Sequence, residues 1–385
     1  MKAAGIICEC NPFHSGHAHL IAEARRLSGA DFIVAVMSGD FVQRGEPAIF
    51  DKYTRTRQVL QGGADMVFEL PVRFCLSSAG DFAMGSVLAM ACLGVVTDLF
   101  FGSECGELAP LMEAAAILSE ETSTGFSKHL QDALRNGLSF PAARAQALTL
   151  TGSVEKSILE QPNNILGIEY CRALLTLDVP IKPNTIPRIG QDYHGNERQK
   201  KCSHPAASAL RRQIYLSKTP HLTLNDCSGT IGYALLKEKN LEKYKDVSPE
   251  LAAHIRKYTD DYVTAAEFTR DCQTRAFTES RIRRALLQIA LELTDTEMTM
   301  PYLRLLGMKK EAGKLLKEAQ ETGPFSTKIL TKLSSDIKHL DDAAAKLLEK
   351  DILASDWYRQ MWRRKYQEKM PNEFQRPPAG QPWNT

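Results

Sequence analysis

The sequence predicts an α/β protein that has a parallel sheet in its N-terminal half and a mainly α-helical C-terminal domain. Two observations predict this fold class. Up to about residue 190, almost wholly apolar runs of strand length alternate with runs that have helical apolar spacing. Strands that are apolar on both faces are typical of a parallel sheet covered by helices on both sides. After Lys218 the strand patterns stop and helical patterns continue.

Five short apolar runs predict the strands of the sheet. They are Ala3–Cys8, Phe32–Met37, Met66–Leu70, Val95–Phe101 and Ile181–Ile186. The helices predicted around them are His17–Leu27, Tyr53–Leu60, Ala79–Leu93, Ile165–Leu175 and Ala206–Leu216. A further helical stretch, about residues 106–150, is expected to form an insertion, with helices at Leu108–Glu121, Phe126–Leu134 and Pro141–Leu150.

Seven helical runs with short turns follow Lys218. They are Asn225–Leu236, Pro249–Lys257, Thr264–Phe277, Glu279–Leu293, Met308–Gln320, Ser326–Leu333 and Asp341–Gln367. The chain is therefore expected to divide into a first domain, residues 1–218, and a second domain, residues 219–370. Residues 371–385 are rich in proline and polar residues, which predicts a disordered tail.

The composition is that of a soluble globular protein, since 43% of the residues are hydrophobic and 24% are charged. No run of about 18 apolar residues predicts a membrane helix, and Met1 and Lys2 lead directly into the first predicted strand without a signal peptide. The nine cysteines form no C-x-x-C unit. We therefore expect free thiols in a reducing cytoplasm and no zinc site formed by cysteines.

Charge is distributed unevenly along the chain. Residues 1–190 contain 15 Lys and Arg against 20 Asp and Glu, whereas residues 191–385 contain 33 against 26. This asymmetry predicts chemistry in the first half and a polyanion, such as RNA, on the second. A solvated helical surface rich in lysine would produce the same charge balance.

The string His14-Ser15-Gly16-His17 lies where the first predicted strand leads into the first helix. An open parallel sheet binds its ligand at such a place, because the helix N-terminus offers free N–H groups and a positive dipole end to a phosphate. Gly16 lets a phosphate approach the backbone closely, and imidazoles can bond phosphate oxygens. These groups suit attack at an α-phosphate, since they would stabilise the charge that develops there.

Polar residues and glycines also follow the other predicted strands. They are Ser38, Gly39, Asp40, Gln43 and Arg44 after the second strand, Glu69 at the end of the third, Gly102, Ser103 and Glu104 after the fourth, and Arg188 after the last. Such a set predicts an ATP site in which an arginine pairs with phosphate and carboxylates hold Mg²⁺. The chain has no P-loop string and no G-x-G-x-x-G after the first strand, so γ-phosphoryl transfer by that route and dinucleotide binding are not expected.

The H-x-G-H string resembles the signature of the nucleotidyltransferase superfamily, and further strings narrow the resemblance. They are, in order, N-P-F-H-S-G-H, S-G-D-F-V-Q-R-G-E-P, F-G-S-E, P-N-N-I-L-G-I-E-Y and I-P-R-I-G-Q-D-Y-H. Together they resemble the bacterial tRNA(Met) cytidine acetate ligase family over the N-terminal 215 residues. The resemblance implies a Rossmann-like nucleotidyltransferase domain in residues 1–218 and a basic, tRNA-binding helical domain in residues 219–370.

The resemblance also implies an activity. Members of this family use ATP, with Mg²⁺ as the expected metal ion, to convert acetate into acetyl-adenylate. They then transfer the acetyl group to the wobble cytidine of elongator tRNA(Met), which gives 4-acetylcytidine. His14 and His17 are the implied catalytic residues. The implied ATP-binding residues are Ile7, Cys8, Glu9, Cys10, Asn11, Pro12, Phe13, His14, Ser15, Gly16, His17, Ala18, His19, Leu20, Gly102, one or both of Asn163 and Asn164, and Arg188.

One string departs from the superfamily pattern. Many members carry I-S-S-T-x-[IL]-R, whereas the matching place here keeps Ser208 and Arg211 but has alanines at the two preceding serine positions. Arg211 could therefore bind phosphate or lie on a plain helix surface. Basic residues that could contact RNA are Arg270, Arg275, Arg281, Arg283, Arg284, Lys309, Lys310, Lys314, Lys317, Arg363, Arg364 and Lys365.

Two other functions fit the residue patterns. One is a nucleotidyltransferase that acts on a different small acid or phosphate ester without RNA. The other is an RNA-binding protein that contains a degenerate nucleotide-binding fold. The residues alone do not indicate how acetate is held, which group deprotonates the cytidine amine or whether the chain forms oligomers.

Overall fold

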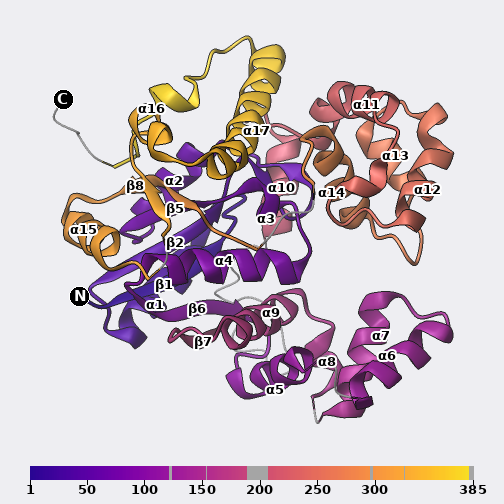
Figure 1. The fold of residues 1–385 in the computed structure, drawn as a ribbon, viewed down its shortest axis with the longest axis horizontal. Helices are drawn as coiled ribbons and strands as arrows, with labels where there is room; N and C mark the ends of the chain where they lie inside the picture. Colours follow the sequence, from indigo (N-terminus) through magenta and orange to yellow (C-terminus); the bar gives the residue numbers. More distant parts are fainter. Residues whose placement is uncertain (121–123, 153, 189–206, 295–297, 325, 381–385) are drawn as a thin grey trace.

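A seven-stranded sheet forms the centre of the protein in the computed structural model, which describes residues 1–120, 124–152, 154–188, 207–294, 298–324 and 326–380 (Figure 1). The strand order is β7-β6-β1-β2-β5-β8-β9. The strands are β1 (Ala3–Cys8), β2 (Phe32–Ser38), β5 (Met66–Leu70), β6 (Val96–Ser103), β7 (Lys182–Pro187), β8 (Tyr302–Met308) and β9 (Lys328–Leu330). The five strands predicted from the N-terminal half are all present and pair in parallel, which confirms the predicted sheet.

Helices cover both faces of the sheet. Successive side chains of a strand point to opposite faces, and here the side chains on both faces are largely apolar. Ile33 and Met37 of β2 belong to one core cluster, whereas Val34 and Val36 belong to another. The helices that complete these two clusters are α1 (Ser15–Ser28) and α2 (Lys52–Gln61) on the first face, and α4 (Ala79–Leu93) and α9 (Pro162–Leu177) on the second. α9 begins three residues before the predicted start at Ile165.

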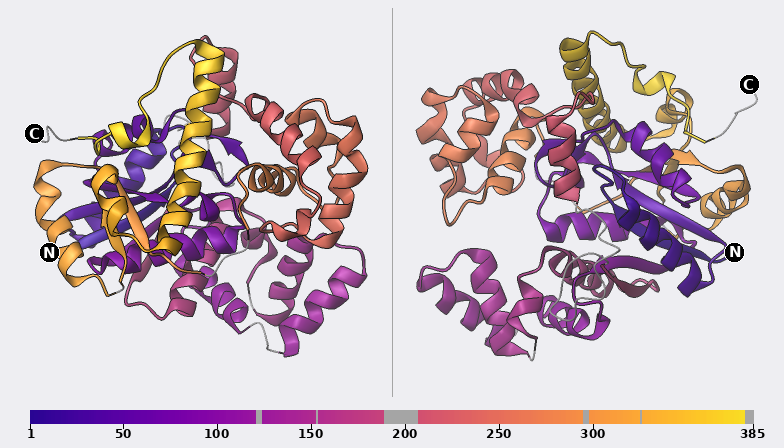
Figure 2. Two further views of the ribbon diagram at one scale, coloured as in Figure 1. Left: turned by 45° about the horizontal axis from the view of Figure 1, so that its top comes forward. Right: turned by 180° about the vertical axis from the view of Figure 1, so that it is seen from behind.

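The predicted helical insertion is present between β6 and β7. Its helices are α5 (Leu108–Ser119), α6 (Thr124–Arg135), α7 (Phe140–Thr151) and α8 (Lys156–Leu159). α6 and α7 pack against each other and form a lobe that projects away from the sheet (Figure 2).

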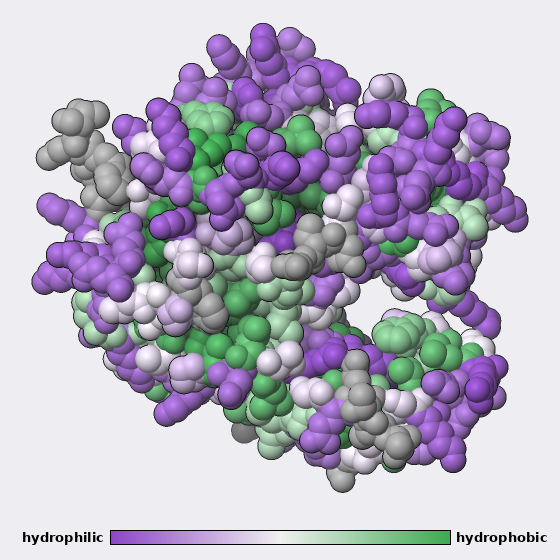
Figure 3. Space-filling model, viewed as in Figure 1, coloured by the Kyte–Doolittle hydropathy of each residue, from purple (hydrophilic) through white to green (hydrophobic). Residues whose placement is uncertain are grey.

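A second helical lobe has its own hydrophobic core. The lobe consists of α11 (Ser228–Lys237), α12 (Pro249–Tyr258), α13 (Ala265–Asp271) and α14 (Glu279–Ala290). Trp357 and Tyr358 of the long helix α17 (Asp342–Tyr366) complete this core. A hollow separates this lobe from the α6–α7 lobe on the face drawn in Figure 3. Among the residues that the structure describes, no helix is both long enough and apolar enough to cross a membrane.

The expectation that strands end before Lys218 is wrong. β8 pairs antiparallel with β5, and β9 pairs with β8, so residues far along the chain extend the sheet. The predicted helix Ser326–Leu333 contains β9, and helix formation after β8 begins only near α15 (Gly313–Thr322) and resumes at α16 (Leu333–Asp336). β8 is rich in leucine and contains Arg304, residue types that favour a helix, and only the open edge of β5 makes it a strand. The division of the chain at residue 218 stays a prediction.

The prediction of a disordered tail is wrong for residues 371–380. Glu373 begins a short 3₁₀ turn and is 4% exposed. The backbone of Ala379 bonds the backbone of β8 at both Leu306 and Met308, with N···O distances of 2.8 and 2.9 Å. Residues 381–385 lie outside the described part of the chain. Proline and polar residues do not prevent order here, because buried groups of the sheet form hydrogen bonds and ion pairs with the segment.

Candidate active site

His14 and His17 lie at the start of α1, immediately after the end of β1. Nδ1 of His14 accepts the backbone N–H of Gly16 at 3.1 Å, and Nδ1 of His17 accepts the backbone N–H of His14 at 3.2 Å. The two rings lie against each other with their centroids 3.9 Å apart. Gly16 suits this turn, because a Cβ there would lie 2.9 Å from the His14 ring. The helix therefore begins at Ser15, two residues before its predicted start at His17, and the histidines themselves cap it.

This capping arrangement sets the protonation of both imidazoles. A ring nitrogen that accepts an N–H bond carries no proton, so in both rings the proton belongs on Nε2. Burial, together with the neighbouring His14 and Arg188, lowers the pKa of His17 to about 3. His17 is therefore neutral at pH 7 and can donate a hydrogen bond from Nε2 without a change of protonation state.

Asn11 anchors the turn that leads to the histidines. Its side-chain Oδ1 accepts the backbone N–H of Ile49 at 2.8 Å, and its backbone carbonyl accepts a bond from the guanidinium of Arg211 at 2.9 Å. Arg211 lies on α10 (Ala207–Leu216). The structure thus brings Arg211 to the edge of the site, whereas the sequence also allowed a plain surface position. Ser208 lies on the same helix, and no contact of its side chain links it to the turn among the described residues.

Arg55 is a residue that the sequence analysis did not identify. It is fully buried in α2, and its guanidinium donates to the backbone carbonyls of Glu9, Ser38 and Gly39. A buried arginine that bonds several carbonyls ties the ends of β1 and β2 together. The one sequence signal for this role is a charged residue on the face of a predicted helix that should pack against the sheet.

The two asparagines that follow Pro162 have different surroundings. Asn164 is fully buried, and its Oδ1 accepts the backbone N–H groups of Glu104 and Cys105 at 2.8 and 3.1 Å. Asn163 is half-buried, and its Oδ1 accepts a bond from Arg188 at 3.2 Å. In return, the Glu104 carboxylate accepts the backbone N–H of Asn164 at 2.9 Å, so it stabilises the start of α9. Asn164 therefore holds the turn after β6, and Asn163 holds the exposed guanidinium of Arg188.

Gly102 lies beside Arg188. A Cβ at residue 102 would come within 3.4 Å of Cγ of that arginine, so a larger side chain would press on it. Ile7 and Cys8 are buried within β1, and Cys10 is buried in the turn. Since burial raises the pKa of the Cys10 thiol, this residue packs as a neutral group.

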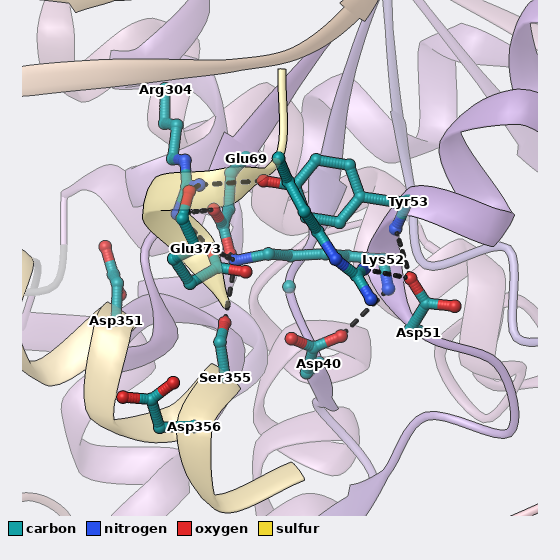
Figure 4. A network of polar contacts seen from close by, with 12 residues as sticks. Asp40, Asp51, Lys52, Tyr53, Glu69, Arg304, Asp351, Ser355, Asp356 and Glu373 are labelled. Atoms are coloured by element: carbon teal, nitrogen blue, oxygen red, sulfur yellow. Dashed lines mark hydrogen bonds and ion pairs between the residues drawn. The ribbon is translucent and has the colours of Figure 1, made fainter. Parts of the chain in front are cut away.

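Two carboxylates that we expected at the ATP site are committed elsewhere. Asp40 accepts the backbone N–H of Lys52 at 2.8 Å, and Glu69 pairs with Nζ of Lys52 at 2.7 Å within a buried polar network (Figure 4). Burial raises the pKa of Asp40 to about 6. A third, Glu104, stabilises the start of α9. No group of three potential metal ligands occurs among the described residues, so these carboxylates do not fit a protein-held Mg²⁺ site.

A small hairpin brings the end of β2 back to the turn after β1. It consists of β3 (Phe41–Val42) and β4 (Glu46–Pro47). The backbone N–H of Gln43 donates to the Glu9 carboxylate at 2.6 Å. Burial raises the pKa of Glu9, although this hydrogen bond lowers it. The motif S-G-D-F-V-Q-R-G-E-P thus supports the turn, while the side chain of Arg44 at the hairpin tip is exposed.

Comparison with known proteins places these features in a family context. A family model described as HIGH Nucleotidyl Transferase matches residues 1–373. Proteins named tRNA(Met) cytidine acetate ligase from Fervidobacterium nodosum and Acetivibrio thermocellus are 34% and 35% identical to this chain, over 97% of it and 98% of each relative. The crystal structure of Thermotoga maritima TmcAL bound with alpha-thio ATP is 29% identical and aligns over 99% of both chains with a TM-score of 0.83.

Proposed function

Because the chain belongs to the HIGH nucleotidyl transferase family, and within it to the tRNA(Met) cytidine acetate ligases, we propose that it acetylates a tRNA cytidine with ATP and acetate. An acetate oxygen attacks the α-phosphorus of ATP, and the bond to pyrophosphate breaks. The exocyclic amine of the wobble cytidine of elongator tRNA(Met) then attacks the acetyl carbonyl. AMP leaves, the amine loses a proton, and 4-acetylcytidine results.

The observation that carries this proposal is the Nε2 donor of His17 at the start of α1. Nδ1 of His17 accepts the backbone N–H of His14, as Nδ1 of His14 accepts that of Gly16, so the neutral His17 ring carries its proton on Nε2 at the positive end of a helix dipole. Donors that are fixed before the reaction stabilise charge that develops on the α-phosphate and on departing pyrophosphate. The relative bound to alpha-thio ATP supports a nucleotide as the ligand of this turn.

The predicted ATP-binding residues take different roles in this proposal. We assign polar contacts with the nucleotide to His14, Gly16, His17, Asn163 and Arg188. The other residues of the predicted set shape the site: Ile7, Cys8, Glu9, Cys10, Asn11, Pro12, Phe13, Ser15, Ala18, His19, Leu20, Gly102 and Asn164. Mg²⁺ would arrive on the phosphates of ATP, because Asp40, Glu69 and Glu104 are already bonded.

The α11–α14 lobe is the proposed tRNA surface. Arg284 of α14 donates to the carbonyl of Gln43 at 3.2 Å, so the lobe contacts the hairpin at the site edge of the sheet. The lobe is largely hydrophilic on the face drawn in Figure 3. Its exposed cations include Arg270 and Arg275, which can pair with phosphates. A location in the cytoplasm stays a prediction.

A direct assay tests the function. Purified protein is incubated with ATP, labelled acetate and an elongator tRNA(Met) transcript, and nucleosides are analysed after digestion. We expect label in 4-acetylcytidine, and none when the wobble cytidine is replaced by uridine. Acetate-dependent exchange of pyrophosphate into ATP reports the first step without tRNA. Exchange that depends on another acid and ignores RNA would contradict the proposal and favour a different nucleotidyltransferase, and absence of any exchange would favour a binding protein.

A further inference from the structure

The C-terminal segment, residues 367–380, binds back onto the sheet through a buried carboxylate. Glu373 Oε2 lies 2.8 Å from Nζ of Lys52, and it also pairs with Arg304 of β8 (Figure 4). All three side chains are at most 6% exposed. Although burial alone would raise it, pairing with Lys52 and Arg304 lowers the pKa of Glu373 to about 2. The segment is thus joined to the sheet by charges that have no access to water.

Lys52 is the residue at which this segment meets α17 and the sheet. Besides Glu373, its ammonium contacts Glu69 of β5 at 2.7 Å and the hydroxyl of Ser355 of α17 at 2.8 Å. Its own backbone N–H donates to Asp40 at 2.8 Å. Lys52 is also the first residue of α2, so it fixes the end of the loop formed by residues 39–51, which connects β2 to α2.

This 39–51 loop lies between the C-terminal elements and the histidine turn. On one side, the hydroxyl of Tyr358 in α17 donates to the carbonyl of Ala48 at 2.9 Å. On the other side, the N–H of the next residue, Ile49, donates to Asn11 Oδ1 at 2.8 Å. Tyr358 is 1% exposed and Asn11 is 4% exposed, so water does not compete for these bonds. Two hydrogen bonds and the one peptide group between Ala48 and Ile49 therefore separate α17 from the turn that carries His14 and His17.

We propose that Tyr358 and Glu373 are positioning residues of the nucleotide site, which act by holding the 39–51 loop against Asn11. The inference rests on the proposed function, since it takes the histidine turn to bind ATP. It gives the ordered C-terminal segment a role in the first half-reaction, before any tRNA is present. Among the described residues, neither side chain bonds the histidine turn itself, so both act through Lys52, Ala48 and Ile49.

The test compares two buried tyrosines, each of which donates a hydrogen bond from its hydroxyl group. Tyr358→Phe removes the bond to the 39–51 loop. Tyr302→Phe is the control, because Tyr302 is 2% exposed and its hydroxyl donates to Asp351 of α17 at 2.7 Å rather than to the loop. Glu373→Gln is the second test variant, which keeps the shape and removes the charge. Each variant is assayed for acetate-dependent ATP–pyrophosphate exchange without tRNA, and its ATP affinity is measured by calorimetry.

We expect Tyr358→Phe and Glu373→Gln to raise KM and Kd for ATP about five-fold or more, with kcat within about two-fold, since a loosened binding turn weakens the ground state and the transition state alike. Tyr302→Phe should leave both constants near those of the unmodified protein. A purely structural role would lower the fraction of folded enzyme, hence kcat, and leave KM unchanged. Equal KM and Kd values for all four proteins would overturn the inference while the proposed function stands. If the unmodified protein catalysed no exchange, the proposed function would fail, and the calorimetric comparison would still decide the inference.

Discussion

At the scale of single residues, the two histidines combine a structural role with the chemical role proposed for them. Each uses Nδ1 to accept a backbone N–H at the start of α1, so that ring nitrogen helps to build the helix. Neutral His17 donates from Nε2 across the physiological pH range, because its pKa is lowered to about 3 by burial and by nearby His14 and Arg188.

The substitution His17→Asn separates these two roles. Asparagine can place Oδ1 where Nδ1 was, so the backbone N–H of His14 keeps an acceptor and α1 should still begin at Ser15. The Nε2–H donor is lost, and loss of one such donor typically costs about 10²–10³-fold in rate. We expect that loss in acetate-dependent ATP–pyrophosphate exchange, with an almost unchanged unfolding temperature. Normal exchange by the His17→Asn variant would remove His17 from the mechanism.

Asn163 and Asn164 offer a second test with a built-in control. Asn164→Ala leaves two buried N–H groups without their acceptor, which should lower the free energy of unfolding by about 2–4 kcal/mol. Asn163→Ala frees Arg188 and removes one half-buried amide donor to the Glu104 carboxylate, so we expect a higher KM for ATP and a stability change below about 1 kcal/mol. Denaturant unfolding and ATP kinetics on both variants distinguish the roles, and similar behaviour of the two would contradict them.

At the scale of elements, the structure sorts the basic residues that the sequence suggested for RNA. Several are committed to contacts within the protein. Arg283 pairs with Glu279 and Glu46, Arg284 donates to Gln43, Lys309 pairs with Asp65, Lys317 with Glu321, and Lys365 with Asp226. Arg270, Arg275, Lys310 and Lys314 are exposed and have no ion pair among the described residues. The topology places these four residues in two regions. Because β8 runs antiparallel to β5, α15, which follows β8, lies at the edge of the sheet opposite the site, and Lys310 and Lys314 lie there with it.

Arg270 and Arg275 should therefore bind tRNA, and Lys310 and Lys314 should not. We expect the double variant Arg270→Gln with Arg275→Gln to weaken tRNA(Met) binding and to lower the slope of log K against log salt by about one to two. The matched double variant Lys310→Gln with Lys314→Gln removes the same charge from the opposite edge. Filter binding at several salt concentrations measures both, and equal losses would show that the effect is net charge alone.

At the scale of the whole molecule, a buried network joins segments that are far apart in the chain. Lys52 and Arg304 supply positive charge, and Glu69 and Glu373 supply negative charge. Asp40 lies beside this network, where Lys52 favours its ionised form and Glu373, Asp51 and Glu69 disfavour it. Burial dominates and raises the pKa of Asp40 to about 6.

This pKa predicts a pH dependence of stability with a definite sign. The unfolded pKa of an aspartate is about 3.9, so between about pH 4 and 6 the folded protein binds more protons at Asp40 than the unfolded chain does. Asp40 thus destabilises the fold as pH rises through that window. The variant Asp40→Asn lacks this contribution. The difference in free energy of unfolding, variant minus unmodified protein, should therefore become more positive by about 2–3 kcal/mol from pH 4 to pH 7. Thermal or denaturant unfolding across this range measures the difference, and a difference that stays constant would show that Asp40 does not titrate there.

Local pattern was enough to predict the first half of the fold and the place of the histidine turn. Apolar runs such as Phe32–Met37 become buried strands, and helical spacing as in Ala79–Leu93 becomes a helix with those bounds. The H-x-G-H string lies at the predicted junction of strand and helix. These features depend on neighbours within a few residues, so the sequence alone determines them.

Tertiary structure decided the rest, because the deciding partners are remote in sequence. β8 is a strand only because β5 has an open edge, and Glu373 is ordered only because Lys52 and Arg304 need a buried counter-charge. Asn163 and Asn164 are the same type of residue, and only the folded chain places one beside Arg188 and the other against the backbone N–H groups of Glu104 and Cys105. The sequence by itself thus determined the sheet and the histidine turn, whereas the protonation, support and surroundings of that turn arose from contacts that only the folded chain brings together.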